Sequence, residues 1–275
     1  MKKLKKLLFR VKRAAKEKGI HYVARAGIKR IIKSTTNLFW YYYYTKIKSR
    51  KTFLFQGVNY RYFYHKHNNT WGNERAVEIP IIQDIVKKSQ GKRILEVGNV
   101  LSRYFRTKHD VLDKYEKADN VINEDAVNFQ PSEKYNLIVS VSTIEHVGWD
   151  EYPREPNKIL KTIEHLKNIL SAGGKMIVTL PLGYNSEMDK FLKEGQLKFD
   201  KRCCLKRITR DSEWVEVSWD DVCGIKYEEP FPCANGLVVA FLSENKNSLR
   251  GVSGQPPILR PISEKNLSAK NINSL

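Results

Sequence analysis

Residues 92–99 read Lys-Arg-Ile-Leu-Glu-Val-Gly-Asn, an apolar run that stops abruptly at an acid and a glycine. An uninterrupted run of Ile, Leu and Val is typical of a strand that is buried on both faces, as in a parallel sheet flanked by helices. Gly98 permits a sharp turn and the close approach of a ligand to the backbone. Glu96 is expected at the carboxyl end of the strand, where open α/β sheets bind their ligands. The stretch therefore predicts a cofactor site.

The loop that follows this strand departs from the dinucleotide-binding pattern. That pattern is G-x-G-x-x-G, whereas residues 98–103 read Gly-Asn-Val-Leu-Ser-Arg and contain a single glycine. On the loop alone, an ordinary turn between a strand and a helix explains the sequence equally well. The rest of the chain must decide between a cofactor turn and an ordinary turn.

Apolar runs alternate with amphipathic segments along the rest of the chain. Pro80 is expected to divide or kink a helix over residues 73–88, and Gly173 and Gly174 are expected to close a helix over residues 157–170. A polar loop region is expected at 183–213. The strands that the apolar runs predict are 94–98, 111–113, 121–122, 137–141, 175–180, 214–217 and 236–242. Strands that alternate with helices predict an α/β fold with a mostly parallel, Rossmann-like sheet.

Acidic residues follow several of these predicted strands. Asp113 lies 17 positions after Glu96, at the end of the next strand, which suits a carboxylate that accepts hydrogen bonds from the ribose hydroxyls of an adenosine. Asp125 follows the third strand and is a candidate acceptor for an adenine amino group. Three acids at this spacing indicate a nucleoside-containing cofactor more strongly than any one of them.

With these segments in place, the sequence resembles the class I S-adenosylmethionine-dependent methyltransferases, and among them the type-11-like group. The matching segments are 94–98, 111–113, 123–126, 144–147 and 172–181. The resemblance implies a seven-stranded sheet with its last strand antiparallel and helices on both faces, and S-adenosyl-L-methionine bound across the strand ends. The family has two further glycines after Gly98, and this chain has Val100 and Ser102 instead. The resemblance implies that Glu96 and Gly98 form the cofactor turn, that Asp113 holds the ribose and that Asp125 faces the adenine. The further cofactor-binding candidates are Asn99 and Ser142.

Methyl transfer requires alignment of donor and acceptor, and often a base that removes a proton from the acceptor. His146, after the fourth predicted strand, is the candidate base, and Glu145 is the candidate residue to orient it or to bind substrate. The alternative is a histidine that lines the cofactor pocket without transferring a proton. Further candidates from flanking loops are His65, His67 and Tyr184.

The first 51 residues carry most of the charge. They contain 17 Lys and Arg against the single acid Glu17, a net charge of +16 out of +19 for the whole chain. Apolar residues recur at helical spacing within this segment, and residues 38–44 form an aromatic cluster. The pattern predicts a basic helical N-terminal extension that lies on an anionic membrane surface. Packing on its own domain or on a partner, and nucleic-acid binding, are the alternatives.

The predicted organisation has four parts. They are a basic arm (1–51), an aromatic-rich cap with a helix (52–90), the Rossmann-like domain (91–245) and a disordered tail (246–275). The run at 38–44 is far shorter than the roughly 20 residues of a membrane-spanning helix, and no secretory signal is apparent, so a cytoplasmic protein at the inner membrane face is expected. The four cysteines lack metal-site spacing and are expected as reduced thiols, and no metal is predicted.

These observations lead to one functional hypothesis and two alternatives. The hypothesis is a methyltransferase that acts on a polar acceptor, such as a glycan, a lipid headgroup or a lipid-linked intermediate, at a membrane surface. The first alternative is a methyltransferase-like binding module without turnover, which the missing glycines motivate. The second is an RNA methyltransferase that holds phosphates with the basic arm.

Overall fold

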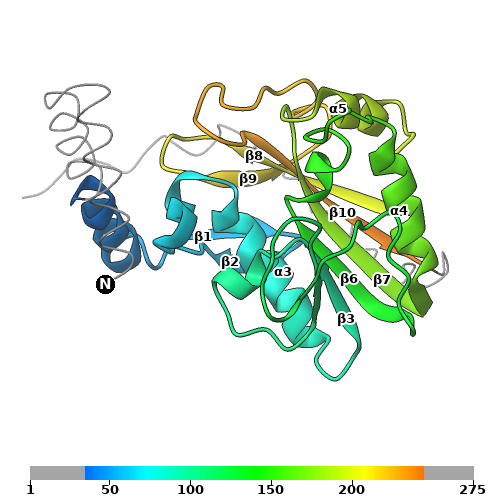
Figure 1. Ribbon diagram of the computed structural model, residues 1–275. Helices are drawn as coiled ribbons and strands as arrows, with labels where there is room; N and C mark the ends of the chain where they lie inside the picture. Colours follow the sequence, from blue (N-terminus) through cyan, green and yellow to red (C-terminus); the bar gives the residue numbers. More distant parts are fainter. Residues whose placement is uncertain (1–34, 245–275) are drawn as a thin grey trace, which may run out of the picture.

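A computed structural model describes residues 35–244, and the fold is built on an eight-stranded mixed sheet (Figure 1). Strands β5, β4, β3, β6 and β7 pair in parallel, whereas β10 runs antiparallel to both β7 and β8. In spatial order the strands are β5 (Val121–Ile122), β4 (Asp110–Leu112), β3 (Ile94–Val97), β6 (Tyr135–Val141), β7 (Leu170–Pro181), β10 (Gly236–Ser243), β8 (Lys201–Arg207) and β9 (Trp214–Val217). The mostly parallel Rossmann-like sheet is confirmed. The expected seven strands become eight because β8, in the segment expected as a polar loop, pairs with β10 and β9.

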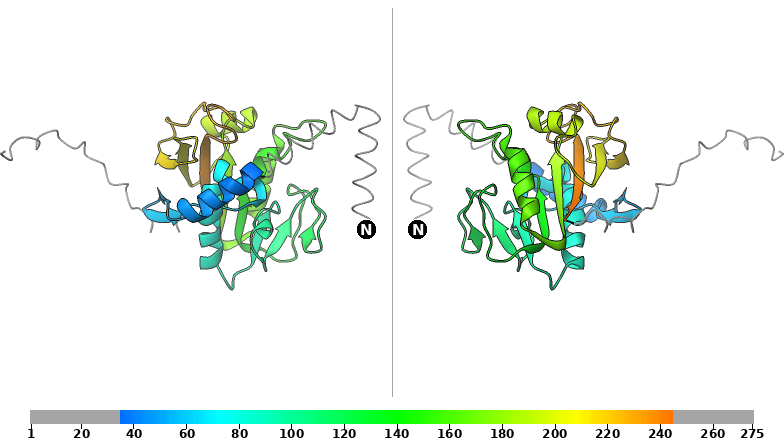
Figure 2. Two further views of the ribbon diagram at one scale, coloured as in Figure 1. Left: turned by 90° about the vertical axis from the view of Figure 1, so that its left-hand side faces the viewer. Right: turned by 90° about the vertical axis from the view of Figure 1, so that its right-hand side faces the viewer.

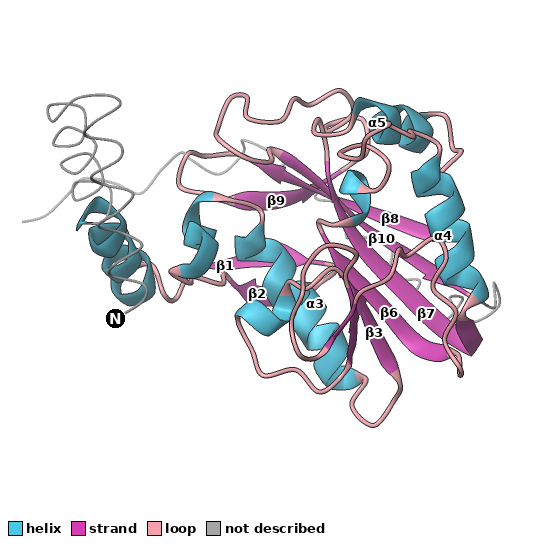
Figure 3. Cartoon of the chain, in the orientation of Figure 1, coloured by secondary structure: helices cyan, strands magenta, loops and turns pink. Residues whose placement is uncertain are grey.

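Helices cover both faces of the sheet, as the sequence predicted (Figures 2 and 3). One face carries α3 (Arg75–Lys88) and a hairpin formed by β1 (Thr52–Phe55) and β2 (Val58–Arg61). The other face carries α4 (Lys158–Asn168) and α5 (Ser186–Lys193). Successive side chains of a strand point to opposite faces, so Ile94 packs in the α3 core and Leu95 in the α4 core. Every residue of β3 is buried, as the unbroken apolar run predicted.

The parallel half of the sheet departs from the expected alternation of strand and helix. Between β3 and β4 the only helical element is the turn η3 (Leu101–Arg103). Residues 113–134, which connect β4 to β6, contain no helix. The connection from β6 to β7 does contain an α-helix, α4. A parallel crossover needs about a dozen residues, and the twelve residues 98–109 meet that length without a full helix. Loops and α3, rather than crossover helices, therefore cover β3 and β4.

Helix α3 runs from Arg75 to Lys88 with Pro80 inside it, so Pro80 does not divide the helix. Proline lacks an N–H, which leaves the carbonyl four residues earlier without its helical donor. That carbonyl belongs to Ala76, and it accepts a hydrogen bond of 2.9 Å from the backbone N–H of Phe63. The segment after the hairpin thus satisfies the group that Pro80 leaves open, and the helix continues through the proline.

Two predicted boundaries are also wrong in the second half of the chain. Helix α4 ends at Asn168, and Gly173 and Gly174 lie inside β7 rather than closing the helix. A Cβ on Gly174 would lie 2.7 Å from the carbonyl oxygen of Ser171, next to a register shift between β6 and β7. The glycines therefore accommodate an irregular strand start. The expected loop at 183–213 contains α5 and β8.

The end of the basic arm packs against the aromatic cap. Residues 35–42 are helical and continue into the short π-helix η1 (Tyr43–Ile47). Tyr44 is buried and stacks on Trp71, with ring centroids 6.1 Å apart. Residues 1–34, with the predicted amphipathic stripes, and the predicted tail after 244 lie outside the described residues. Across residues 35–244, no helix combines the length and the apolar character that crossing a bilayer requires.

Asp189 in α5 provides a test of the energetics of this fold. One carboxylate oxygen accepts a hydrogen bond of 2.8 Å from Gly183 N–H, and the other is buried with no hydrogen-bond partner. Burial raises the pKa of Asp189 to about 6, although the Gly183 bond opposes the shift. An unfolded aspartate titrates near about 3.9. Between about pH 4 and pH 6 the folded protein therefore retains a proton that the unfolded chain has lost, and stability falls as pH rises.

We expect Asp189→Asn to raise the free energy of unfolding by about 1–2 kcal/mol at pH 7.5, because asparagine avoids the buried charge. The gain should shrink as pH is lowered toward 4. Urea denaturation at a series of pH values measures both effects, and Asp119→Asn at an exposed position is the control. A gain that is the same at pH 4 and pH 7.5 would contradict the assignment of a raised pKa.

Candidate active site

A cavity of about 480 Å³ lies where the carboxyl ends of β3 and β4 meet the segment after β6. The chain order of the strands reverses at this point, since β4 lies on one side of β3 and β6 on the other. Open α/β sheets bind ligands at such a switch point. The predicted residues Gly98, Asp113, Asp125 and His146 all line the cavity. The sequence thus placed four of its eight site candidates around one space.

Acidic side chains dominate the cavity wall. Lys114 and His146 are the basic residues in its lining. The acidic residues in the lining are Asp113, Glu116, Glu124, Asp125, Asp150 and Glu151. Carboxylates accept hydrogen bonds from hydroxyl and ammonium groups and attract positive charge. This set of hydrogen-bond acceptors suits a ligand with a ribose, an ammonium group and a sulfonium.

Glu96 organises the loop after β3 instead of lining the cavity. Its side chain is fully buried, and one carboxylate oxygen accepts hydrogen bonds from the backbone N–H groups of Val100 (2.9 Å) and Leu101 (2.7 Å). The other oxygen lies 2.8 Å from His109 Nε2. Glu96 therefore holds the backbone of the one-glycine loop in place through hydrogen bonds from inside the core.

Gly98 occupies a position that no other residue fits. Its φ is +89°, and a Cβ would lie 2.2 Å from the hydroxyl oxygen of Thr143. Left-handed backbone favours glycine, and the close neighbour adds a steric requirement. Both Gly98 and Thr143 line the cavity, so this contact brings the loop after β3 against the segment after β6.

Asn99 connects the same loop to two acids of the cavity. Its backbone N–H donates to Asp113 Oδ2 (3.2 Å), and its side-chain amide donates to Glu116 Oε1 (2.8 Å). The other oxygen of Asp113 accepts from the N–H groups of Tyr115 (2.9 Å) and Glu116 (2.8 Å). These bonds hold the Asp113 carboxylate at the end of β4. Asn99 itself lies behind the lining residues.

Asp125 is held in a network of ion pairs. Its Oδ2 lies 2.8 Å from the ammonium nitrogen of Lys114 and 2.6 Å from that of Lys158. Both lysines also contact Glu151, at 3.1 Å and 2.6 Å. Burial acts to raise the pKa of Asp125, but the hydrogen bonds from the two lysines outweigh it and leave the pKa below its usual range. Asp125 is ionised at neutral pH, and its carboxylate forms ion pairs with both lysines.

His146 forms a hydrogen-bonded chain with two residues from flanking segments. Its Nδ1 lies 2.6 Å from Asp150 Oδ2, and Tyr184 O–H donates to the same oxygen at 2.7 Å. The rings of His146 and Tyr184 meet edge to face, with centroids 4.8 Å apart. Burial opposes ionisation of Asp150, yet the bonds from Tyr184 and His146 lower its pKa. An ionised carboxylate at Nδ1 favours the tautomer in which Nε2 is the free acceptor.

Glu145 and Ser142 face a buried cluster beside the cavity. Ser142 has φ +36°, and its hydroxyl donates to Glu78, which also pairs with Arg75 at 2.7 Å. Glu145 Oε1 lies 3.6 Å from His146 Nε2, beyond hydrogen-bond range. Burial raises the pKa of Glu145 well above its usual range, and the charges of Glu78 and Glu74 add to this. The Glu145 carboxyl therefore favours its protonated form, and Asp150 is the residue that orients His146.

Several residues of the site were not identified from the sequence. Asp150 lies four positions after His146, a spacing that the sequence does display. Glu116 and Lys158 reach the site only through tertiary contacts. The further candidates His65 and His67 lie outside the cavity lining and pack against Tyr104, with centroids 5.3 Å and 5.5 Å away.

The strand order with an antiparallel β10 between β7 and β8, and a cavity at the switch point, define the class I methyltransferase fold. No family model matches the sequence, and no curated protein matches it.

Solved structures similar to this chain include three methyltransferases. The N-methyltransferase NodS from Bradyrhizobium japonicum WM9, in complex with S-adenosyl-L-homocysteine, is 10% identical, with 58% of this chain and 84% of that chain covered and a TM-score of 0.36. A SAM-dependent methyltransferase from Thermotoga maritima is 12% identical, with 60% and 87% covered and a TM-score of 0.36. An rRNA methylase from Streptococcus thermophilus is 13% identical, with 61% and 97% covered and a TM-score of 0.37.

Proposed function

We propose that this chain is an S-adenosyl-L-methionine-dependent methyltransferase that acts on a polar acceptor at a membrane surface. The observation that carries the proposal is the acidic cavity at the switch point of the sheet, with the His146–Asp150 pair at its wall. A cavity of about 480 Å³ falls within the roughly 300–1,000 Å³ of small-molecule sites.

The residues of the cavity fit the parts of this cofactor. Asp113 and Glu116 are the carboxylates available to the ribose hydroxyls, and Glu124 and Asp125 lie where the adenine is expected. The cofactor, when bound, supplies an electrophilic methyl group on a cationic sulfonium. The acidic wall favours such a cation over neutral or anionic ligands.

His146 is the residue that we propose as the base. Asp150 keeps the proton of the imidazole on Nδ1, so that Nε2 is able to accept a proton from an oxygen or nitrogen nucleophile of the acceptor. Tyr184 supports the pair through its hydrogen bond to Asp150. The side chain of His146 is 45% exposed, which leaves Nε2 accessible to a substrate.

An exposed apolar patch on the described end of the arm supports the membrane part of the proposal. Leu38, Phe39, Trp40, Tyr42 and Ile47 are between 42% and 70% exposed. Lys46, Lys48, Arg50 and Lys51 lie in the same stretch of sequence. Exposed aromatic and aliphatic side chains beside basic residues suit the headgroup layer of an anionic bilayer. The acceptor would then be a lipid headgroup, a glycan or a lipid-linked intermediate presented at that surface.

One observation favours a second candidate function, a methyltransferase-like binding module without turnover. Asp125, the residue expected to face the adenine, is already paired with Lys114 and Lys158. These ion pairs occupy the Asp125 carboxylate, and Val100 and Ser102 stand where the methyltransferases that the sequence resembles have glycines. Both features reduce the contacts that the chain offers to the cofactor. The module is expected to bind ligand without methyl transfer.

Co-sedimentation with vesicles tests the membrane part of the proposal. We expect the full chain to sediment with phosphatidylglycerol vesicles at low salt and to be released at high salt, because each basic residue near the surface contributes about 1 kcal/mol and salt screens it. Leu7→Asp plus Ile28→Asp should abolish binding although the basic residues remain.

The matched control is Leu54→Asp plus Val58→Asp, at exposed apolar positions of the hairpin, which should leave vesicle binding unchanged. Nucleic-acid binding would depend on Lys and Arg and little on these leucine and isoleucine residues. A chain that ignores anionic vesicles at low salt, but holds RNA through the double aspartate substitution, would replace the membrane proposal with an RNA methyltransferase.

A further inference from the structure

A second cavity, of about 570 Å³, lies between the carboxyl-terminal half of α3 and the connection from β3 to β4. It exists because residues 98–109 contain no helix beyond the three-residue turn η3, so nothing fills the space beside α3. Lys92 precedes β3 and His109 precedes β4, which places this cavity toward the opposite ends of these strands from the acidic cavity. It is therefore a separate site.

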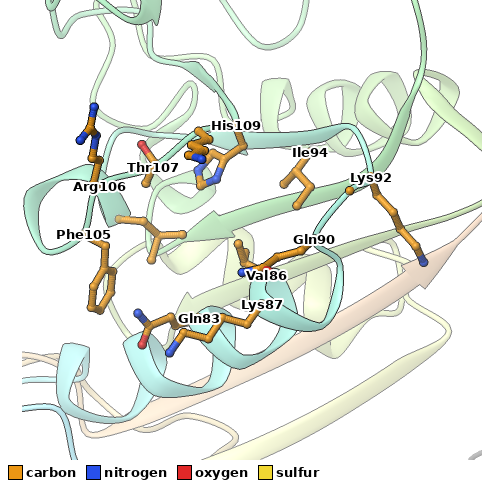
Figure 4. A pocket seen from close by; sticks show the side chains of 13 residues that line it. Gln83, Val86, Lys87, Gln90, Lys92, Ile94, Phe105, Arg106, Thr107 and His109 are labelled. Atoms are coloured by element: carbon orange, nitrogen blue, oxygen red, sulfur yellow. The ribbon is translucent and has the colours of Figure 1, made fainter.

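The lining of this cavity is basic. Its lining residues include no Asp or Glu. The cationic members are Lys87, Lys92, Arg106 and Lys108, with His109 beside them. In Figure 4, Lys87 on α3 lies across the cavity from Thr107 and His109, while the side chains of Arg106 and Lys92 extend outward at the rim, from its two ends. A hollow lined by charges of one sign focuses the electrostatic potential and attracts ions of the other sign.

These four Lys and Arg side chains are available to a ligand. None of them forms an ion pair or side-chain hydrogen bond with another described residue, although the charge of Lys87 helps to lower the pKa of Asp84, after the hydrogen bonds from Lys88 and Tyr60. Lys114, Lys158 and Arg93 elsewhere in the fold are all paired with acids. Arg106 adds a planar guanidinium, which binds phosphate oxygens in a bidentate manner. Unpaired cations of this kind, gathered on one hollow, are suited to an anion with several oxygens.

The floor of the cavity is apolar. Val86, Ile94, Leu101 and Phe105 contribute to the lining, and Leu101 is 2% exposed. Glu96 holds this loop in place through the N–H of Leu101 and through His109, so the floor and one wall are fixed by the same buried carboxylate. A ligand that fits both features carries a phosphate group on an apolar body.

We infer that this cavity binds a phosphate group attached to an apolar body, the chemistry shared by a phospholipid headgroup region and a free organic phosphate. The inference goes beyond the methyl-transfer site and does not depend on it. The gap between α3 and the loop supplies the volume, the unpaired Lys and Arg bind the phosphate, and the apolar floor receives the rest of the ligand.

Calorimetric titration of the full chain with phenyl phosphate tests this inference, with benzyl alcohol as the uncharged counterpart. We expect phenyl phosphate to bind with a submillimolar Kd and benzyl alcohol to give no binding. Lys87→Gln plus Arg106→Gln should weaken phenyl phosphate binding at least tenfold. Lys134→Gln plus Lys161→Gln removes the same charge at exposed positions outside the cavity and should leave the Kd unchanged.

Vesicles of phosphatidylglycerol distinguish the two sources of the phosphate. Loss of vesicle binding in the Lys87 and Arg106 double variant assigns the cavity to a lipid headgroup, whereas loss of phenyl phosphate binding alone assigns it to a free organic phosphate. No binding of phenyl phosphate overturns the inference, whether or not the vesicles bind through the N-terminal arm. An equal loss in the Lys134 and Lys161 control overturns it as well, because the effect would then follow net charge.

Discussion

His146→Ala is expected to lower the rate of methyl transfer by about 10²–10⁴-fold, the scale for removal of a general base. The affinity for S-adenosyl-L-homocysteine should change little, because the imidazole acts on the acceptor. Transfer of a radiolabelled methyl group to a polar lipid extract measures the rate, and calorimetry measures the affinity. Asp150→Asn should lower the rate in the same direction, since the neutral amide no longer favours the Nδ1–H tautomer.

His67→Ala is the matched control for this prediction. His67 is an exposed histidine that lies outside the acidic cavity, and its removal should leave both rate and affinity unchanged. Tyr184→Phe keeps the ring contact with His146 but removes the hydrogen bond to Asp150, so an intermediate loss of rate is expected. Equal losses of rate and cofactor affinity in His146→Ala would assign His146 to cofactor binding alone.

Glu96→Ala is expected to lower the free energy of unfolding by about 2–5 kcal/mol, because each buried donor that loses its acceptor costs about 1–3 kcal/mol. The substitution leaves the N–H of Leu101 without its acceptor and His109 without its partner, while the N–H of Val100 keeps only its bond of 3.1 Å to the Gly98 carbonyl. Urea denaturation followed by circular dichroism measures the loss. Glu96→Gln keeps one acceptor oxygen and should lose less.

Glu133→Ala is the control for the stability measurement. The side chain of Glu133 is 79% exposed and pairs with Arg93 at 2.9 Å, and an exposed ion pair contributes about 0–1 kcal/mol. If Glu96→Ala costs no more than Glu133→Ala, Glu96 does not hold the loop between β3 and β4. Glu96 would then not be the residue that stabilises the walls of the two cavities.

Much of the sheet could be predicted from local sequence. The run at 94–97 has no polar side chain except Glu96, and β3 is buried along its whole length. The continuity of α3 was not predictable, because the donor that replaces the missing helical bond of Pro80 comes from Phe63, thirteen residues earlier than Ala76. Met188, Phe191 and Leu192 are buried at helical spacing in α5, so this helix was visible in the sequence and was missed.

The candidate site was predictable where a residue follows a strand. Gly98, Asp113, Asp125 and His146 meet at one cavity because the carboxyl ends of parallel strands share one edge of a sheet. Ion pairs across the fold are not encoded in spacing, so the two lysines that hold Asp125 were not expected. For Glu145, adjacency to His146 suggested an orienting role, but its buried carboxyl lies 3.6 Å from His146 Nε2, beyond hydrogen-bond range.

The most direct test of the central claim is calorimetric titration of the full chain with S-adenosyl-L-homocysteine. The acidic cavity at the ends of β3 and β4 predicts a saturable one-to-one isotherm with a Kd in the micromolar range. Lys114→Ala, which removes one of the two cations on Asp125, should retain this binding and serves as an internal comparison. No detectable binding to the folded chain would contradict the methyltransferase proposal.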